Sequence, residues 1–220
     1  MKGFFITGSD TGCGKTHVAC ALINFLRKRA KKVAPFKPVA AGAMNFSAEK
    51  RNEDAVNLIR SSGINWDYGL VNPYCFSEPI SPHLTAKDDG ITVNLNTIIE
   101  SASNLSKRSD ILVAEGAGGW MVPISDNLDV ADIAEKLNLP VIMVVGLRLG
   151  CLNHARLTER AILGSQSRLL GWVATQVDPK MMRVNENIHT LENKLTSPCL
   201  GKVFHGKSAE FKETLILEYV

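Results

Sequence analysis

The sequence predicts an α/β fold in which a mostly parallel central sheet is covered by helices on both faces. Short segments that are apolar throughout alternate with segments of helical periodicity along most of the 220 residues. Strands that are buried on both faces read as continuous apolar runs, which is the pattern of a parallel sheet. In addition, a glycine-rich loop follows the first apolar run and precedes a helical segment, the order found in phosphate-binding loops. We therefore predict one P-loop NTPase-like domain over residues 1–220.

The expected elements follow one another along the chain as strand and helix. Apolar runs and helical spacing predict strands over 4–6, 33–39, 111–114, 140–146 and 169–174, and helices over 17–28, 49–61, 130–137, 153–163 and 186–195. One segment, 72–90, breaks this pattern with three prolines and little periodicity. It could be a plain connecting loop, but loops of this length are uncommon unless they have a function. We expect a functional loop.

Composition argues against several classes of protein. Charged residues make up 21% of the chain and the net charge is only +3, so the sequence indicates no nucleic-acid partner. The basic stretch 27–32 is interpreted as a solvated helix end. Apolar runs stay far below the roughly 20 residues that span a bilayer, and no secretory pattern opens the chain. The five cysteines form no CxxC pair, which disfavours a disulfide framework or zinc site. A reduced, cytoplasmic protein without a membrane partner is expected.

The glycine loop in "FFITGSDTGCGKT" has the composition of a phosphate cradle. Gly12 and Gly14 permit the tight turn in which backbone N–H groups surround an anion. Lys15 can reach phosphate oxygens, the hydroxyl of Thr16 can bind Mg²⁺, and the following helix directs its positive end at the anion. Five residues separate Gly8 from Gly14, one more than in the usual motif. The context of strand, loop and helix favours a nucleotide site over a structural turn.

Two acidic residues and a lysine are candidates for chemistry near that loop. Glu115 ends an apolar strand and precedes a glycine-rich turn, at the edge of the sheet where α/β proteins bind ligands. Asp54 is either a Mg²⁺ ligand or an ordinary acid in a first helical turn. Lys37 is either a strand-edge lysine or a cation directed into the cleft. Near 150–153, Asn153 is expected to cap a helix whose free N–H groups could also receive a substrate carboxylate.

Several motifs together resemble the dethiobiotin synthetase family along nearly the whole chain. They are "TGSDTGCGKT", "FKPVAAG", "RNEDA", "VNPYCFSEPISPH", "VAEGAGGWMVP", "LPVIMVVGLRLGCLNHARLT" and "GWVA". The family's own glycine loop carries the extra residue. The resemblance implies ATP-dependent ring closure of 7,8-diaminopelargonic acid with CO₂, with Mg²⁺ as cofactor and ATP as co-substrate. A carbamate would attack the γ-phosphorus to give a carbamic–phosphoric anhydride, and the second amine would then close the ring. Family members are homodimers with the active site near the interface.

The resemblance also implies roles for residues at the matching positions. Lys37 and Lys15 would be catalytic, and Thr16, Asp54 and Glu115 would bind Mg²⁺. The nucleotide would contact Gly12, Cys13, Gly14, Lys15, Thr16, His17, Asp54, Glu115, Gly116, Ala117, Gly118, Thr175, Gln176, Phe204, His205 and Gly206. The substrate would contact Thr11, Lys37, Ala41, Gly118, Gly150, Cys151, Leu152 and Asn153.

The chain departs from the family pattern away from the phosphate and the metal. Ala41 replaces a common serine, Thr175 and Gln176 stand where an asparagine beside the purine is expected, "GKVFHG" lacks a proline, and Asn187 replaces a tyrosine that can reach the substrate tail. These changes bear on base recognition and tail affinity. The main alternative is a regulatory P-loop ATPase switch of the partitioning type, but such switches carry an early lysine in the loop where this chain has Ser9 and Asp10. A cobalamin-type amide synthetase and a simple small-molecule kinase are further alternatives.

Overall fold

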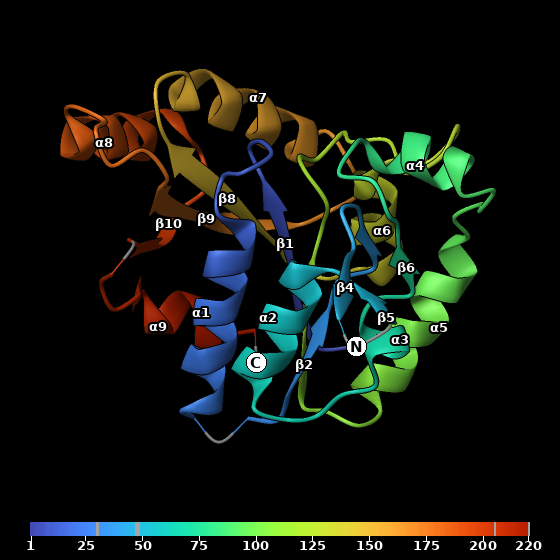
Figure 1. Cartoon of the computed structure of the whole chain (residues 1–220). Helices are drawn as coiled ribbons and strands as arrows, with labels where there is room; N and C mark the ends of the chain where they lie inside the picture. Colours follow the sequence, from blue (N-terminus) through green and yellow to red (C-terminus); the bar gives the residue numbers. More distant parts are fainter. Residues whose placement is uncertain (30, 47–48, 205, 220) are drawn as a thin grey trace.

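A seven-stranded sheet forms the centre of the computed structural model, which describes residues 1–29, 31–46, 49–204 and 206–219 (Figure 1). The strand order is β11-β10-β9-β8-β1-β7-β2. The strands are β1 (Gly3–Gly8), β2 (Val33–Phe36), β7 (Ile111–Glu115), β8 (Val141–Leu147), β9 (Leu169–Gln176), β10 (Cys199–Val203) and β11 (Glu210–Phe211). All neighbouring strands are parallel except β10 and β11. The predicted mostly parallel sheet is confirmed.

Helices cover both faces of this sheet. They are α1 (Lys15–Arg27), α2 (Glu53–Ser62), α3 (Tyr68–Val71), α4 (Pro82–Asp88), α5 (Leu95–Ser106), α6 (Val130–Leu137), α7 (Cys151–Leu163), α8 (Val184–Lys194) and α9 (Glu213–Leu217). Phe4 and Ile6 of β1 pack into one apolar cluster with α1 and α9, whereas Phe5 packs into the other with α5, α6, α7 and α8. Side chains of β1 alternate between the two faces, so both faces of the central strand are buried.

The position of β1 between β7 and β8 determines where the functional loops meet. Ile6 of β1 pairs with Glu115 of β7, and Gly8 pairs with Val144 of β8. The carboxyl ends of these three strands therefore lie at one edge of the sheet, where open α/β folds bind ligands. In Figure 1 the loop from β1 to α1 lies at the upper end of the sheet, beneath α7.

The predicted strand 33–39 is wrong in its length. The structure divides it into β2 and a short β3 (Val39–Ala40), which pairs with β6 (Tyr74–Cys75) in a separate two-stranded sheet. The backbone N–H of Lys37 donates to Val71 O at 2.8 Å instead of continuing the central sheet. Pro38 has no N–H to donate, so the chain leaves the sheet between the two strands. β2 is an edge strand, which tolerates its own Pro35.

Several predicted helix starts also need correction. The helix expected over 49–61 begins only at Glu53, because Asn52 caps it and 49–51 form β5 (Glu49–Arg51) in a hairpin with β4 (Met44–Phe46). The helix expected from Asn153 begins at Cys151 after Gly150, whose φ of 94° favours glycine. Asn153 is therefore not the N-cap. α1 begins two residues before the expected 17, at Lys15, and α8 begins two before the expected 186, at Val184.

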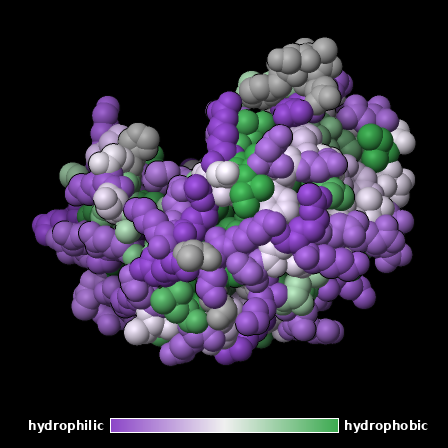
Figure 2. Space-filling view, turned by 90° about the horizontal axis from the view of Figure 1, so that it is seen from below, coloured by the Kyte–Doolittle hydropathy of each residue, from purple (hydrophilic) through white to green (hydrophobic). Residues whose placement is uncertain are grey.

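The segment 72–90 is more regular than the sequence indicated, because it contains β6 and α4. The helix α5 was not predicted from the sequence; Asn94 caps it by accepting from the backbone N–H of Asn96 at 2.8 Å. Among the residues that the structure describes, no helix has the length and apolar character needed to cross a bilayer. Figure 2 looks at the end of the molecule opposite the glycine loop, which is mostly hydrophilic with small, separated apolar areas.

Candidate active site

The glycine loop forms a tight turn that wraps the start of α1. Gly12 and Gly14 have φ values of 68° and 90°, in the left-handed region that favours glycine. Cys13 between them is buried, and the Cα of Cys13 would lie 2.8 Å from a Cβ at Gly146 of β8. The loop thus packs directly on the neighbouring strand. Gly146 leaves the space that Cys13 occupies, and Gly12 and Gly14 permit the turn that brings Cys13 there.

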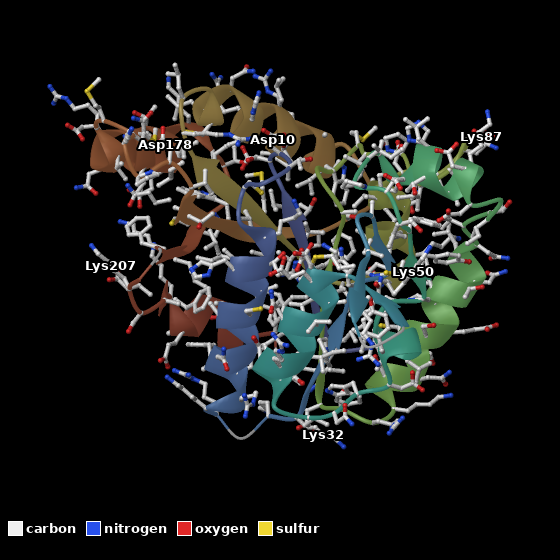
Figure 3. All side chains as sticks on the ribbon, in the orientation of Figure 1. Asp10, Lys32, Lys50, Lys87, Asp178 and Lys207 are labelled. Atoms are coloured by element: carbon white, nitrogen blue, oxygen red, sulfur yellow. The ribbon has the colours of Figure 1, made fainter. Side chains whose placement is uncertain are left out.

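Lys15 lies inside the loop that precedes it. Its side chain is buried, and its Nζ donates to the backbone O of Asp10 at 3.2 Å. The carboxylate of Asp10 in turn pairs with Arg148, which also donates to Thr11 O at 3.2 Å. Figure 3 shows Asp10 at the upper end of the sheet close to α7, and Lys32 at the opposite end. The arginine after β8 was not among the predicted site residues, although it braces the loop that was.

Glu115 is the centre of a buried polar cluster. Its Oε1 accepts from Thr16 Oγ1 at 2.8 Å and from Lys37 Nζ at 2.6 Å. Lys37 also donates to Gly116 O at 3.2 Å and lies 3.0 Å from Oδ2 of Asp54. Glu115 is fully buried and the side chain of Lys37 is 4% exposed, whereas that of Asp54 is 42% exposed. The structure therefore brings together the three predicted metal ligands and Lys37, one of the two predicted catalytic lysines.

The charges in this cluster stabilise one another. Burial by itself would lower the pKa of Lys37, but the carboxylates of Glu115 and Asp54 raise it above the usual range. Burial would raise the pKa of Asp54, but Lys37, with help from Thr16 and Lys15, holds it below its usual value. At neutral pH, therefore, Lys37 is a cation and Asp54 an anion.

The cluster fits a magnesium ion, which would bind the carboxylate oxygen of Glu115 that has no other partner in the ranges that the structure describes. The second carboxylate oxygen, Oε2, is buried and lacks a hydrogen-bond partner among the described residues. Leaving a buried charged oxygen unpaired is costly. Mg²⁺ takes oxygen ligands from one or two carboxylates, a hydroxyl, phosphate and water. In the described part of the chain, no three or more His, Cys, Asp or Glu side chains lie together as a metal site.

A cleft of about 680 Å³ opens over this cluster. Of the predicted site residues it is lined by Thr11, Gly12, Gly14, Lys15, Thr16, Lys37, Ala41, Asp54, Glu115, Ala117 and Gly118. Its other lining residues are Ala40, Asn52, Pro79, Ile80, Ser81, Pro82 and Val122. The residues from 79 to 82 belong to the segment that we expected to be functional. Asn52 was missed as a lining residue, although an asparagine two positions before Asp54 is a recognisable cap signal.

Those of the predicted base-binding residues that the structure describes lie outside the lining of this cleft. Thr175 is buried against the glycine loop, since its Cγ2 would lie 2.8 Å from a Cβ at Gly14. Gln176 donates from Nε2 to Asp178 O at 3.4 Å, and Phe204 packs against the main apolar cluster. His205 lies outside the described residues. The role of this region in base recognition stays a prediction.

The predicted carboxylate site at the start of α7 also stays a prediction. The N–H of Cys151 donates to Arg148 O at 3.0 Å and that of Asn153 to Gly150 O at 3.1 Å. Asn153 is exposed and Cys151 is buried. The remaining predicted nucleotide contacts outside the lining set are His17, which is exposed, and Cys13, Gly116 and Gly206.

Comparisons with known proteins agree with this architecture. A family model described as "AAA domain" matches residues 2–208. The chain is 44% identical to the ATP-dependent dethiobiotin synthetase BioD of Xanthomonas euvesicatoria pv. vesicatoria over 91% of this chain and 89% of that protein. It is 41% identical to the ATP-dependent dethiobiotin synthetase BioD of Aromatoleum aromaticum, over 95% of this chain and 93% of the relative.

Solved structures with little sequence identity share the fold. The signal recognition particle receptor FtsY from Elizabethkingia anophelis matches 99% of this chain at 14% identity with a TM-score of 0.59, and this chain spans 64% of that one. A ParA family ATPase from Chlorobium tepidum TLS matches 94% of this chain and 86% of its own, at 12% identity with a TM-score of 0.56. At such identity the likeness concerns the fold alone, so it does not favour a regulatory switch.

Proposed function

The chain belongs to the ATP-dependent dethiobiotin synthetases, ligases of biotin biosynthesis, and from this premise we propose which residues carry out the reaction. The substrates are 7,8-diaminopelargonic acid, CO₂ and ATP, and the products are dethiobiotin, ADP and phosphate. The observation that carries the proposal is the position of Lys37, whose buried ammonium group lies 2.6 Å from Glu115 and 3.0 Å from Asp54 at the cleft.

The reaction proceeds in three bond-forming steps in this cleft. One amine of the substrate attacks CO₂ and loses a proton, which gives a carbamate. A carbamate oxygen then attacks the γ-phosphorus of ATP, and the bond between that phosphorus and the oxygen of ADP breaks. The second amine attacks the carbonyl carbon of the resulting anhydride and loses a proton, and the C–O bond to phosphate breaks as the ring closes.

Lys37 stabilises the negative charge that gathers on the carbamate and the transferred phosphoryl group. Phosphoryl transfer depends on positioning and cations more than on covalent participation by the protein. The raised pKa of Lys37 keeps its side chain a cation at neutral pH. The buried carboxylates also fix its position, so little reorganisation is needed as the charge develops.

Lys15 and the glycine loop hold the phosphates. The ammonium group of Lys15 now donates to the carbonyl of Asp10, a neutral partner that a β- or γ-phosphate oxygen can replace. The backbone N–H groups around Gly14 and the start of α1 supply further donors. Thr16, Asp54 and Glu115 would hold Mg²⁺, which neutralises phosphate charge when it is bound.

The substrate extends from the reaction centre toward α7. Thr11, Ala41 and Gly118 line the cleft beside Lys37 and bind the reacting end. The carboxylate tail reaches the backbone of 150–153. At the reacting end, Ala41 has no hydroxyl to offer the substrate, so we expect shape and backbone groups to recognise the substrate beside this residue.

The active enzyme is a homodimer that pairs through the surface around α7. Met121, Leu149 and Leu157 are exposed by 63%, 98% and 56%, and Met121 and Leu157 line a groove of about 330 Å³ beside Thr11. Exposed apolar side chains that lie together in one area, as Met121 and Leu157 do in this groove, can mark a surface that a partner covers. Leu149→Glu should convert the dimer to a monomer in sedimentation analysis, whereas a parent protein that sediments as a monomer would contradict this arrangement. The enzyme works in the cytoplasm, where thiols such as its five free cysteines stay reduced.

The assignment is tested by mass spectrometry of the complete reaction. The protein is incubated with 7,8-diaminopelargonic acid, ¹³C-bicarbonate, ATP and Mg²⁺, and the products are separated and weighed. We expect dethiobiotin that carries one ¹³C, together with ADP and phosphate in equal amounts. A phosphorylated stable product, or ATP hydrolysis without dethiobiotin, would overturn the proposed function.

A further inference from the structure

A tyrosine outside the cleft lining connects the two segments that carry Lys37 and Asp54. The hydroxyl of Tyr68, in α3, accepts from the backbone N–H of Asn52 at 2.7 Å and donates to Oδ1 of Asn72 at 2.8 Å. Asn52 and Asn72 are 7% and 3% exposed. The same hydroxyl lies 3.4 Å from Sγ of Cys75. A phenolic hydroxyl has one hydrogen to donate and can accept from another donor, so the shorter contacts to the two asparagines are sufficient to satisfy it.

Asn72 supports the backbone of Lys37. Its side-chain amide donates to Lys37 O at 2.6 Å and to Tyr74 O at 3.1 Å. The N–H of Lys37 donates to the preceding carbonyl, Val71 O, at 2.8 Å. The backbone N–H and C=O of Lys37 are therefore hydrogen-bonded to Val71 and Asn72, consecutive residues at the end of α3. These two bonds fix the position of the backbone from which the Lys37 side chain extends.

Asn52 gives Asp54 the same kind of support. Its Oδ1 accepts from the N–H of Asp54 at 3.0 Å and caps α2, and its Nδ2 donates to Ala41 O at 3.1 Å. A capped first turn fixes the direction of Asp54, whose carboxylate meets Lys37. One hydrogen-bonded chain thus runs from Ala41 through Asn52, Tyr68 and Asn72 to Lys37.

We propose that Tyr68 is a positioning residue: its hydroxyl joins Asn52 and Asn72 into one frame that sets where Lys37 and Asp54 meet in the cleft. This inference rests on the proposed roles of Lys37 and Asp54. Tyr68 does not itself line the cleft, and it reaches Lys37 and Asp54 through the two asparagines, of which Asn52 is a lining residue. Burial raises the pKa of Tyr68, so the hydroxyl keeps its proton at any pH at which the enzyme would work.

The test compares two tyrosine hydroxyls in the same part of the molecule. Tyr68→Phe removes the link between the asparagines and leaves buried polar groups without partners. Tyr74→Phe is the matched control, because the hydroxyl of Tyr74 also accepts from a backbone N–H, that of Asn94 at 2.9 Å, but connects to neither Lys37 nor Asp54. Thermal unfolding of both variants confirms that each is folded at the assay temperature.

We expect Tyr68→Phe to lower kcat about tenfold, less than the 10²-fold that a 1 Å misplacement can cost, while the KM for ATP stays within twofold. Its apparent Mg²⁺ requirement should rise, and Tyr74→Phe should keep kcat within twofold. In a Lys37→Ala background, Tyr68→Phe should lower kcat clearly less than the tenfold expected in the parent, since one of the two groups that it positions is gone. Asn72→Ser, which removes the donor to Lys37 O, should reproduce the loss of kcat.

Three results would overturn the inference: a Tyr68→Phe enzyme with kcat within twofold of the parent, an equal loss in Tyr74→Phe, or a tenfold loss that persists in the Lys37→Ala background. These outcomes are distinct from failure of the proposed function, in which the parent protein itself makes no dethiobiotin.

Discussion

The reaction end and the base end of the proposed nucleotide site are built in different ways. At the reaction end, residues far apart in the sequence meet through buried contacts, as Thr16 and Lys37 both do at Glu115. At the base end, the polar contacts are local, such as that of Gln176 with Asp178 O, and Thr175 packs against Gly14. Long-range buried contacts specify a geometry closely, because any displacement leaves a buried charge unpaired. Substitutions at the reaction end should therefore affect the rate strongly, whereas substitutions at the base end should affect the choice of base only weakly.

The largest expected effect comes from removing the cation at the reaction end. Lys37→Ala should lower kcat by about 10²–10³, the usual cost of losing one preorganised donor to developing charge. Nucleotide affinity should barely change, because Lys15 and the loop backbone hold the phosphates. Steady-state kinetics with calorimetric ATP titration would measure both quantities. Lys32→Ala, at the opposite end of the sheet, is the control (Figure 3); a Lys37→Ala enzyme within a few-fold of the parent would make Lys37 a structural residue.

A smaller effect is expected from the metal ligands. Asp54→Asn should raise the Mg²⁺ concentration needed for half-maximal activity by at least about tenfold. This is the smaller end of the loss in metal affinity that follows when a residue supporting a metal ligand is removed. Glu53→Gln alters the neighbouring exposed acid on the same helix turn and should leave the Mg²⁺ requirement unchanged. Equal Mg²⁺ requirements in the two variants would make Asp54 an ordinary acid in the first turn of α2.

The same ion pair should make stability depend on pH. Because folding lowers the pKa of Asp54, its carboxylate stabilises the fold above the unfolded value of about 3.9 and loses this contribution as the pH falls through the folded pKa. Because folding raises the pKa of Lys37, its contribution is complete below about 10.4 and is lost as the pH rises through the folded pKa. The stability difference between parent and Asp54→Asn, measured by urea unfolding, should therefore shrink toward pH 3. A difference that stays constant from pH 6 to pH 3 would refute this account.

The smallest effect concerns the base. A hydrogen-bonded pair to the base contributes about 1 kcal/mol, and Thr175 and Gln176 do not offer the expected asparagine amide there. Stacking by an aromatic residue is tolerant of base identity. ATP should therefore exceed GTP or CTP only about tenfold in kcat/KM. Parallel kinetics at equal Mg²⁺ would test this, and an ATP preference above roughly a thousandfold would show that other groups read the adenine.

The sequence predicted those parts of the fold and site that follow from local pattern. The apolar runs, the glycine loop and the position of Glu115 at a strand end were sufficient to place the phosphate cradle and one acid. Pro38 and Asn52 carried local signals for a strand end and a helix cap, but the long apolar and helical patterns outweighed them. As a result β2 was extended too far and α2 was begun too early.

The remainder depends on contacts that have no sequence signature. Lys37 reaches Glu115 across 78 positions of the chain, and Tyr68 joins Asn52 to Asn72 through one hydroxyl. Whether Lys37 was a strand-edge lysine or a buried cation could not be decided from its neighbours, because burial is set by α3 and β7 packing around it. Arg148 lies within one of the quoted motifs, but its ion pair with Asp10 spans 138 positions of the chain and could not be read from that motif.

The central claim, that Lys37 acts on the carbamate after it forms, is tested most directly by ¹³C NMR of the working enzyme. The parent and Lys37→Ala proteins are each followed with ¹³C-bicarbonate, 7,8-diaminopelargonic acid and Mg-ATP. The account predicts that the label reaches the ureido carbonyl of dethiobiotin in the parent, whereas in Lys37→Ala it remains in the carbamate over the same period. Ring closure in Lys37→Ala at a rate close to that of the parent would contradict the account.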